Sequence, residues 1–131
     1  MTPDKIVGLP GIAKNLRIGH RSDFERLRLE GLSSTSRSAV LVWLDAPSTR
    51  FGVICSKRYS LLSVERNRAR RLLWESFRLI APHLIRTGMI LAIVRKGMAG
   101  KKRQEVTSDL LKMLKKQRAV PEDLTLDQAT R

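Results

Sequence analysis

The chain has 131 residues, and its 26 Lys and Arg against 12 Asp and Glu give a formal net charge of +14 at pH 7. Such an excess makes a polyanion the expected partner, while 42% hydrophobic residues suffice for a folded core. One Cys excludes an intramolecular disulfide and a cysteine-built zinc site, and two isolated His argue against a histidine metal cluster. No apolar run approaches the ~18 residues of a membrane span, and the N-terminus does not read as a secretory signal, so we expect a cytoplasmic protein.

The positive charge is distributed unevenly along the chain. Residues 61–118 hold 15 basic and 4 acidic side chains, an excess of eleven, whereas residues 119–131 hold one basic and three acidic side chains. A concentrated block of this kind favours a binding face over general solubilisation.

The N-terminal third predicts an arm, a helix and a polar linker. Prolines and glycines within residues 1–15 indicate a flexible arm. Ser22 then suits a helix N-cap with Glu25 as its capping-box partner, and Gly31 is expected to end that helix. The polar run 33–38 that follows is interpreted as a connection.

Two strands are predicted next. Residues 39–44 form a continuous apolar run of strand length, and the turn residues 45–48 separate it from a second strand over Arg50–Cys55. Because the loop is short, we expect the two strands to pair as an antiparallel hairpin.

The second half predicts a helix, a strand and a helix. Apolar positions spaced by three, four and seven residues indicate a helix over Leu62–Ala81, ended by Pro82. Residues 89–94 predict a strand, residues 102–118 a last helix, and residues 119–131 a flexible tail. The order α-β-β-α-β-α predicts an α+β fold, a small two-layer sandwich formed by a single domain over residues 16–118.

The most informative stretch of the sequence lies at the start of the long helix. Five donor-rich side chains fall within six residues, namely Arg66, Asn67, Arg68, Arg70 and Arg71. Like charges one helical turn apart cost about 0.2–0.5 kcal/mol per pair, so their crowding indicates an anionic partner that offsets the repulsion. Guanidinium groups grip phosphates in a bidentate manner, and the Asn amide suits a base edge. The alternative is a solvated charged face whose arginine stems cover apolar neighbours.

Other side chains allow two interpretations. Phe24 suits either core packing or base stacking, and Tyr59 either stacking on RNA or filling a surface gap. Trp43 is expected in the core, Trp74 beside Arg70 and Arg78 in a cation–π contact, and Cys55 as a small buried hydrophobe. The acidic residues are scattered, and there is no Gly-rich nucleotide loop. The pattern favours a binder of RNA over an enzyme with its own catalytic residues.

The combined motifs resemble the protein subunit of bacterial ribonuclease P. The resemblance is strongest from Gly52 to Leu79, through the Ser56-Lys57-Arg58 step and the Arg66-Asn67-Arg68 signature, and it covers about residues 15–118. Three positions depart from the family pattern: Trp74 replaces an Arg, Arg28 stands where a second aromatic often follows the Asp-Phe pair, and Arg58 replaces a Lys. The spacing from Ser56 to Arg66 also suits only the longer-loop members of the family.

The resemblance implies a ribonucleoprotein enzyme that removes the 5′ leader of precursor tRNA. The RNA subunit would perform the hydrolysis with Mg²⁺ bound by that RNA and not by protein side chains, so no catalytic residue is expected in the chain. The residues implied to face the catalytic RNA are Arg66, Asn67, Arg68, Arg70 and Arg71, and those implied to line the leader-binding cleft are Phe24, Lys57 and Arg58. The family fold also implies a left-handed βαβ crossover at the arginine helix, and neither a membrane nor a small-molecule substrate is expected.

Two other function classes remain open from the residues. A plain RNA- or DNA-binding module would share the basic helix but would not use Phe24 and Lys57. A protein-only nuclease would need a general base, for which His20 or Glu65 would have to serve.

Overall fold

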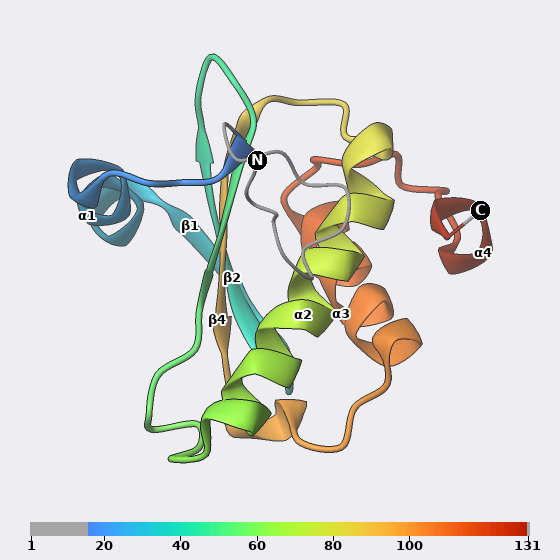
Figure 1. Cartoon of the computed structure of the whole chain (residues 1–131). Coiled ribbons are helices and arrows are strands. Elements are labelled where there is room, and N and C mark those ends of the chain that lie inside the picture. The colour runs from blue at the N-terminus through green and yellow to red at the C-terminus, as the bar shows by residue number, and fades with distance from the viewer. Residues whose placement is uncertain (1–15, 131) are drawn as a thin grey trace.

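The computed structural model describes residues 16–130 (Figure 1). The predicted flexible arm, residues 1–15, lies outside this range. The helices are α1 (Arg21–Glu30), α2 (Ser63–Ile80), α3 (Arg103–Lys116) and α4 (Leu126–Ala129), and the strands are β1 (Leu32–Thr35), β2 (Ala39–Asp45), β3 (Arg50–Ile54) and β4 (Gly88–Val94). Two 3-10 turns, η2 (Ala81–His83) and η3 (Lys96–Met98), follow α2 and β4. The mixed α+β class predicted from the sequence is confirmed.

The strands form one sheet in the order β1-β2-β4-β3. β2 is antiparallel to both β1 and β4, whereas β3 is parallel to β4. The predicted β2–β3 hairpin is therefore wrong, because β4 lies between the two strands. The run in β4 is buried over its first five residues, as expected of a central strand, and residues 46–49 span the ~10 Å across it.

The strand β1 was not predicted from the sequence. Leu32–Thr35 pairs only with β2, so it is an edge strand, and three of its four residues are exposed. An edge strand of this kind lacks the apolar run that marks the inner strands, and its polar residues suggest a linker instead. The observed order is α-β-β-β-α-β-α-α.

The first helix begins earlier than its capping signal indicates. His20, not Ser22, is the N-cap of α1; its carbonyl accepts the backbone N–H groups of Asp23 and Phe24, and no side chain caps the helix. The predicted Ser22–Glu25 capping box is wrong, since Ser22 lies inside the first turn. The predicted stop is confirmed: Gly31 donates its N–H to the Leu27 carbonyl at 2.9 Å.

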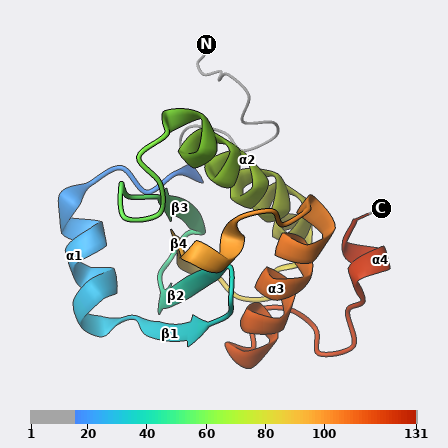
Figure 2. The same cartoon turned by 90° about the horizontal axis from the view of Figure 1, so that it is seen from below.

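The sheet separates two apolar cores of different size. α2 and α3 cover one face and α1 the other (Figures 1 and 2). The larger core joins the α2 and α3 faces to the sheet, for example through Phe51 and Phe77, whose ring centroids lie 4.9 Å apart. The smaller core lies under α1 and contains Ile18, Leu27, Val42, Met89 and Leu91. This division follows the alternation of side chains along β2 and β4.

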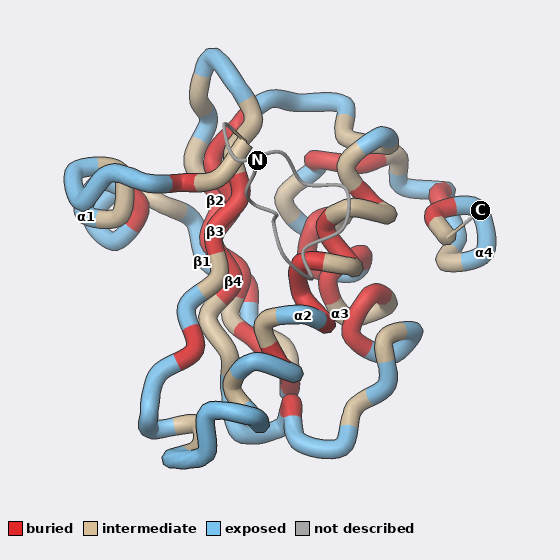
Figure 3. The backbone as a smooth tube through the Cα atoms, viewed as in Figure 1, coloured by how far each residue is buried: buried red, intermediate tan, exposed pale blue. Residues whose placement is uncertain are grey.

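Residues 119–130 pack against the body of the protein. Val120, Leu124 and Ala129 are buried in the larger core. Thr125 is the N-cap residue of α4 and forms a capping box with Gln128. Figure 3 shows buried backbone (red) at α4 among exposed stretches (pale blue). This differs from the flexible tail that Pro121 and the polar residues after it predict, because a few apolar residues at wide spacing are enough to hold the segment on α3.

The connection β3–α2–β4 places the arginine-rich helix over the sheet. β3 and β4 run in the same direction. Between them, the chain returns through α2 on the face of the sheet that α3 also covers, and it then enters β4, which lies behind β3 in the view of Figure 1 (Figures 1 and 2). This path is a left-handed crossover, the rare sense for a parallel βαβ unit. Within residues 16–130, no helix is both long and apolar enough to cross a membrane.

Candidate nucleic-acid interface

The helix α2 buries one side and leaves its polar arc outside. Its buried positions recur at helical spacing and face the sheet and α3, namely Ala69, Leu72, Leu73, Trp74, Ser76, Phe77 and Ile80. The five donor-rich residues predicted to bind RNA fall outside this stripe, and Asn67, Arg68 and Arg71 are exposed. The predicted helix and the predicted outward placement of these side chains are both confirmed.

Arg66 and Arg70 are held by the chain that leaves β3. Arg66 Nη1 donates to the Ser60 carbonyl at 2.8 Å, and Arg70 Nη2 donates to the Cys55 carbonyl at 3.1 Å. Arg70 Nη1 also donates to Asn67 Oδ1 at 3.1 Å. These bonds fix the direction of both guanidinium groups and of the Asn67 amide, so less side-chain entropy is lost when an anion binds.

Arg68 leans to the opposite flank of the helix. Its Nη2 donates to the Lys101 carbonyl at 2.8 Å, in the connection between η3 and α3. Arg71 lies between the two flanks, is exposed, and makes no hydrogen bond with the described residues. The five side chains therefore fan out from one helix, with anchored members at the edges and Arg71 free to reach a partner.

The positive charge of this arc is not neutralised within residues 16–130. The described ion pairs lie elsewhere, between Glu25 and Arg28 at 2.8 Å and between Asp45 and Arg86. The nearest acidic side chain on the helix, Glu65, accepts a hydrogen bond from the Ser60 hydroxyl instead. The arc is thus open to an external polyanion such as RNA.

The three residues assigned to the leader cleft come from α1 and from the turn after β3. Phe24 is half-buried and packs against the smaller core, so it has a structural role whatever else it does. Lys57 and Arg58 are exposed, and the Arg58 backbone N–H donates to Ser56 Oγ at 3.2 Å. Figures 1 and 2 place this turn on the same side of the sheet as α1, and Ile54 at the end of β3 is 38% exposed.

One cation near α2 was not found by sequence reasoning. Arg17 Cζ lies 5.1 Å from the centroid of the Trp74 ring, and Trp74 is 7% exposed. The stacking partner is therefore Arg17, not the predicted Arg70 or Arg78. Burial lowers the pKa of the Arg17 guanidinium. An isolated parallel β-bridge between the backbones of Arg17 and Phe51 holds the two segments together. Since these residues are distant in the sequence, no local pattern predicts this contact.

The groups that a protein-only nuclease would need come from different elements of the described part of the chain. Cys55 is 6% exposed, and burial raises the pKa of its thiol, which suits the predicted hydrophobe and not a nucleophile. His20 occupies the N-cap position of α1, whereas Glu65 lies in the first turn of α2. Residues 16–130 contain no group of three or more His, Cys, Asp or Glu side chains that could hold a metal ion.

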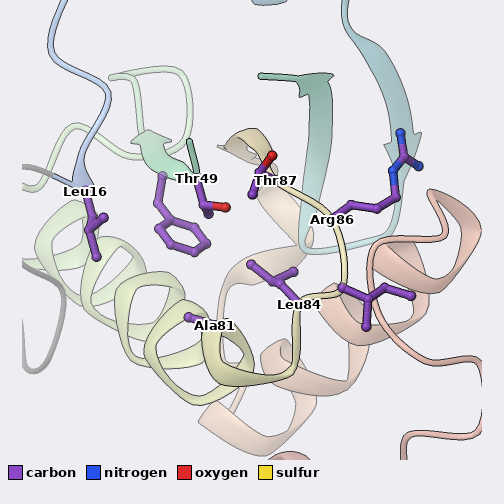
Figure 4. A pocket seen from close by; sticks show the side chains of 8 residues that line it. Leu16, Thr49, Ala81, Leu84, Arg86 and Thr87 are labelled. Carbon is purple, nitrogen blue, oxygen red and sulfur yellow. The ribbon is translucent and has the colours of Figure 1, made fainter. Parts of the chain in front are cut away.

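A pocket at the other end of α2 is mostly apolar. It has a volume of about 370 Å³ and is lined by Leu16, Thr49, Phe51, Ala81, Leu84, Ile85, Arg86 and Thr87 (Figure 4). No residue predicted to bind RNA lines it. Its one cation, Arg86, is paired with Asp45.

Comparison with known proteins matches this fold and these motifs. The family model for Ribonuclease P matches residues 12–118. The ribonuclease P protein component of an Exiguobacterium species is 33% identical over 105 residues, which are 79% of this chain and 90% of that protein. The ribonuclease P protein component of Desulforapulum autotrophicum is 31% identical over 112 residues, which are 84% and 95% of the two chains.

A solved structure confirms the architecture. The RNase P protein of Staphylococcus aureus superposes with a TM-score of 0.72 at 24% identity, over 81% of this chain and 98% of that one. With the match of the family model over most of its length, the chain belongs to the family of the ribonuclease P protein component, the protein part of the enzyme that processes tRNA.

Proposed function

We propose that this chain binds the catalytic RNA of ribonuclease P through the outer arc of α2 and supports removal of the 5′ leader from precursor tRNA. The observation that carries the proposal is the fan formed by Arg66, Asn67, Arg68, Arg70 and Arg71, none of which is ion-paired within residues 16–130. Phosphate oxygens of a folded RNA would supply the counter-charges that the protein lacks.

The anchored side chains support recognition by shape. Because Arg66 and Arg70 are held by backbone carbonyls, their remaining N–H donors point in fixed directions. Fixed donors suit one arrangement of phosphates better than others, which would distinguish a particular RNA fold from RNA in general.

The leader of the precursor would lie on the α1 side of the sheet. Phe24 offers a ring for stacking, and Lys57 and Arg58 offer exposed charges on the same side. Contacts of this kind act on a single strand without reading its sequence, as processing of many precursors requires.

The chemistry in this proposal belongs to the RNA. Mg²⁺ held by the RNA subunit would supply the hydrolysis, and the protein side chains would bind and orient the two RNAs. No step is assigned to a protein-bound ion, since the acidic residues of the described part are not grouped as a metal site would require.

The proposal is tested by measuring the affinity of the chain for ribonuclease P RNA over a range of salt concentrations. A structured RNA of the same length and unrelated fold is the control. We expect affinity for both RNAs to fall with salt, as counterion release requires, but tighter binding to ribonuclease P RNA at every concentration. Equal binding to the two RNAs would instead favour a plain nucleic-acid-binding module.

A further inference from the structure

A second, hollowed surface lies beside the arginine helix. A pocket of about 530 Å³ between the start of α2 and η3 is lined by Tyr59, Glu65, Arg68, Lys96, Ala99 and Gly100. Its size is in the range of sites for small organic groups, about 300–1,000 Å³. It shares only Arg68 with the outer arc, and its chemistry is different, since it combines an aromatic ring, two cations and one carboxylate.

The aromatic wall of this pocket is fixed in place. The Tyr59 backbone N–H donates to the Ser56 carbonyl at 3.0 Å, and its half-buried side chain packs against the larger core. Burial is the main cause of a raised pKa for the Tyr59 phenol, and a phenol is neutral at physiological pH even without such a shift. A neutral, immobilised ring is a suitable platform for a flat heterocycle.

The cations lie where a phosphate attached to that heterocycle would be neutralised. Arg68 is oriented by its bond to the Lys101 carbonyl at 2.8 Å, which leaves its other guanidinium donors available. Lys96 is exposed at the start of η3 and has no ion-pair or hydrogen-bond partner among the described side chains. Gly100 has φ of +77°, and an added Cβ there would meet nothing within 4 Å, so the floor beside Lys96 is open.

The carboxylate gives the pocket a selective element. Glu65 Oε1 accepts a hydrogen bond from the Ser60 hydroxyl, which orients the group, and Oε2 has no partner within residues 16–130. A free carboxylate oxygen repels phosphate and carbonyl oxygens but accepts a hydrogen bond from an amino group. The exocyclic amino group of cytosine is a donor of this kind, whereas uracil presents a carbonyl oxygen at the same position.

We propose that this pocket binds one unpaired nucleobase that carries an exocyclic amino group, such as cytosine, in preference to uracil. The base would stack on Tyr59, its amino group would donate to Glu65, and its phosphate would contact Arg68 and Lys96. The proposal rests on the proposed function, because it names a local contact of the same RNA-binding protein. The nucleotide comes either from the RNA subunit or from the precursor leader.

The test compares binding of oligocytidine and oligouridine hexamers to the full chain at low salt. We expect the unchanged protein to bind oligocytidine about fivefold more tightly. Glu65→Gln removes the preference, because an amide both donates and accepts. Tyr59→Ala weakens oligocytidine binding about fivefold, whereas Tyr59→Phe retains it. Lys112→Ala, on the exposed side of α3, is the control for loss of one charge and leaves the preference intact.

Equal binding of the two hexamers by the unchanged chain would overturn the proposal, as would a preference that survives Glu65→Gln. These results are distinct from failure of the proposed function, in which the unchanged chain would not prefer ribonuclease P RNA over the control RNA. The source of the base is found with the same variants: weaker binding of the RNA subunit by Tyr59→Ala assigns it to that RNA, and a loss confined to leader-bearing precursor assigns it to the leader.

Discussion

Arg70 and Arg71 are neighbours on α2 but are held in different ways. Arg70 donates to Cys55 and Asn67, whereas Arg71 makes no hydrogen bond with the described residues and is exposed. We therefore expect the loss of Arg71 to change RNA binding without changing the fold, whereas the loss of Arg70 also removes contacts that join α2 to the end of β3.

Arg71→Ala is expected to weaken binding of ribonuclease P RNA about tenfold, which corresponds to about 1.4 kcal/mol. It should also reduce the slope of log affinity against log salt by about one, since one phosphate contact is lost. Thermal unfolding should be unchanged. The matched variant Lys112→Ala removes a charge from α3, and an equal loss of affinity in that variant would show that only total charge matters.

Phe24 combines packing against the smaller core with the expected stacking on the leader. Phe24→Leu keeps an apolar side chain in the core but removes the ring. We expect affinity for leader-bearing precursor tRNA to fall about fivefold, the lower end of the stacking range, with affinity for leaderless tRNA unchanged. Equal losses for both substrates, measured with the assembled enzyme, would assign Phe24 to the core alone.

Ser76 and Thr107 form a buried polar contact between α2 and α3. Their hydroxyl oxygens lie 2.8 Å apart, and each also lies 2.8 Å from a carbonyl one helical turn earlier, at Leu72 and Arg103. The two hydroxyl groups have only two hydrogens to donate, so at most two of these three close oxygen pairs are hydrogen-bonded at one time. Because Thr107 keeps the Arg103 carbonyl as its acceptor, Ser76→Ala should cost only about 1 kcal/mol of unfolding free energy.

Denaturant unfolding measures this cost directly. A loss above about 3 kcal/mol, the cost of leaving a buried polar group unpaired, would mean that Thr107 depends on Ser76 for its hydrogen bond.

At the scale of the elements, the segment after α3 completes the larger core. The Ile85 N–H donates to the Ala119 carbonyl at 2.8 Å, and Val120, Leu124 and Ala129 are buried. Ending the chain after residue 118 should remove about 3–6 kcal/mol of stability, at about 1.5–3 kcal/mol for each large apolar side chain withdrawn from the core. The midpoint of thermal unfolding should fall accordingly.

Leu124→Ala is the milder form of the same change, with an expected loss of about 2–3 kcal/mol. At a temperature where this variant is folded, its affinity for RNA should equal that of the unchanged chain, because Leu124 lies away from the arc of α2. For the chain that ends after residue 118, an unaltered midpoint of thermal unfolding would show that residues 119–130 contribute nothing to the stability of the core.

At the scale of the whole molecule, the sequence predicted the elements that depend on the spacing of apolar residues along the chain. It did not predict the order in which the strands pair in the sheet. The bounds of α2 and its polar arc follow from the spacing of residues such as Leu73 and Ile80. The position of β4 between β2 and β3 cannot be read from a short loop, since sheet order is decided by contacts between distant segments.

The candidate site shows the same division. The five donors of α2 were identified because they fall within six residues of the sequence, whereas Arg17 and Trp74 are 57 positions apart and their contact gave no local signal. Tyr59 and Glu65 were noted separately, and only the fold brings them with Lys96 to one pocket. The roles of Phe24, Lys57 and Arg58 stay predictions from the family resemblance.

The central claim is that this chain assists an RNA that carries the chemistry. The measurement that tests it most directly is cleavage of precursor tRNA at low magnesium by the protein mixed with a bacterial ribonuclease P RNA, beside each component alone. We predict 5′ leader removal in the mixture and none by the protein alone. Cleavage by the protein alone, or no stimulation over the RNA alone, would contradict the account.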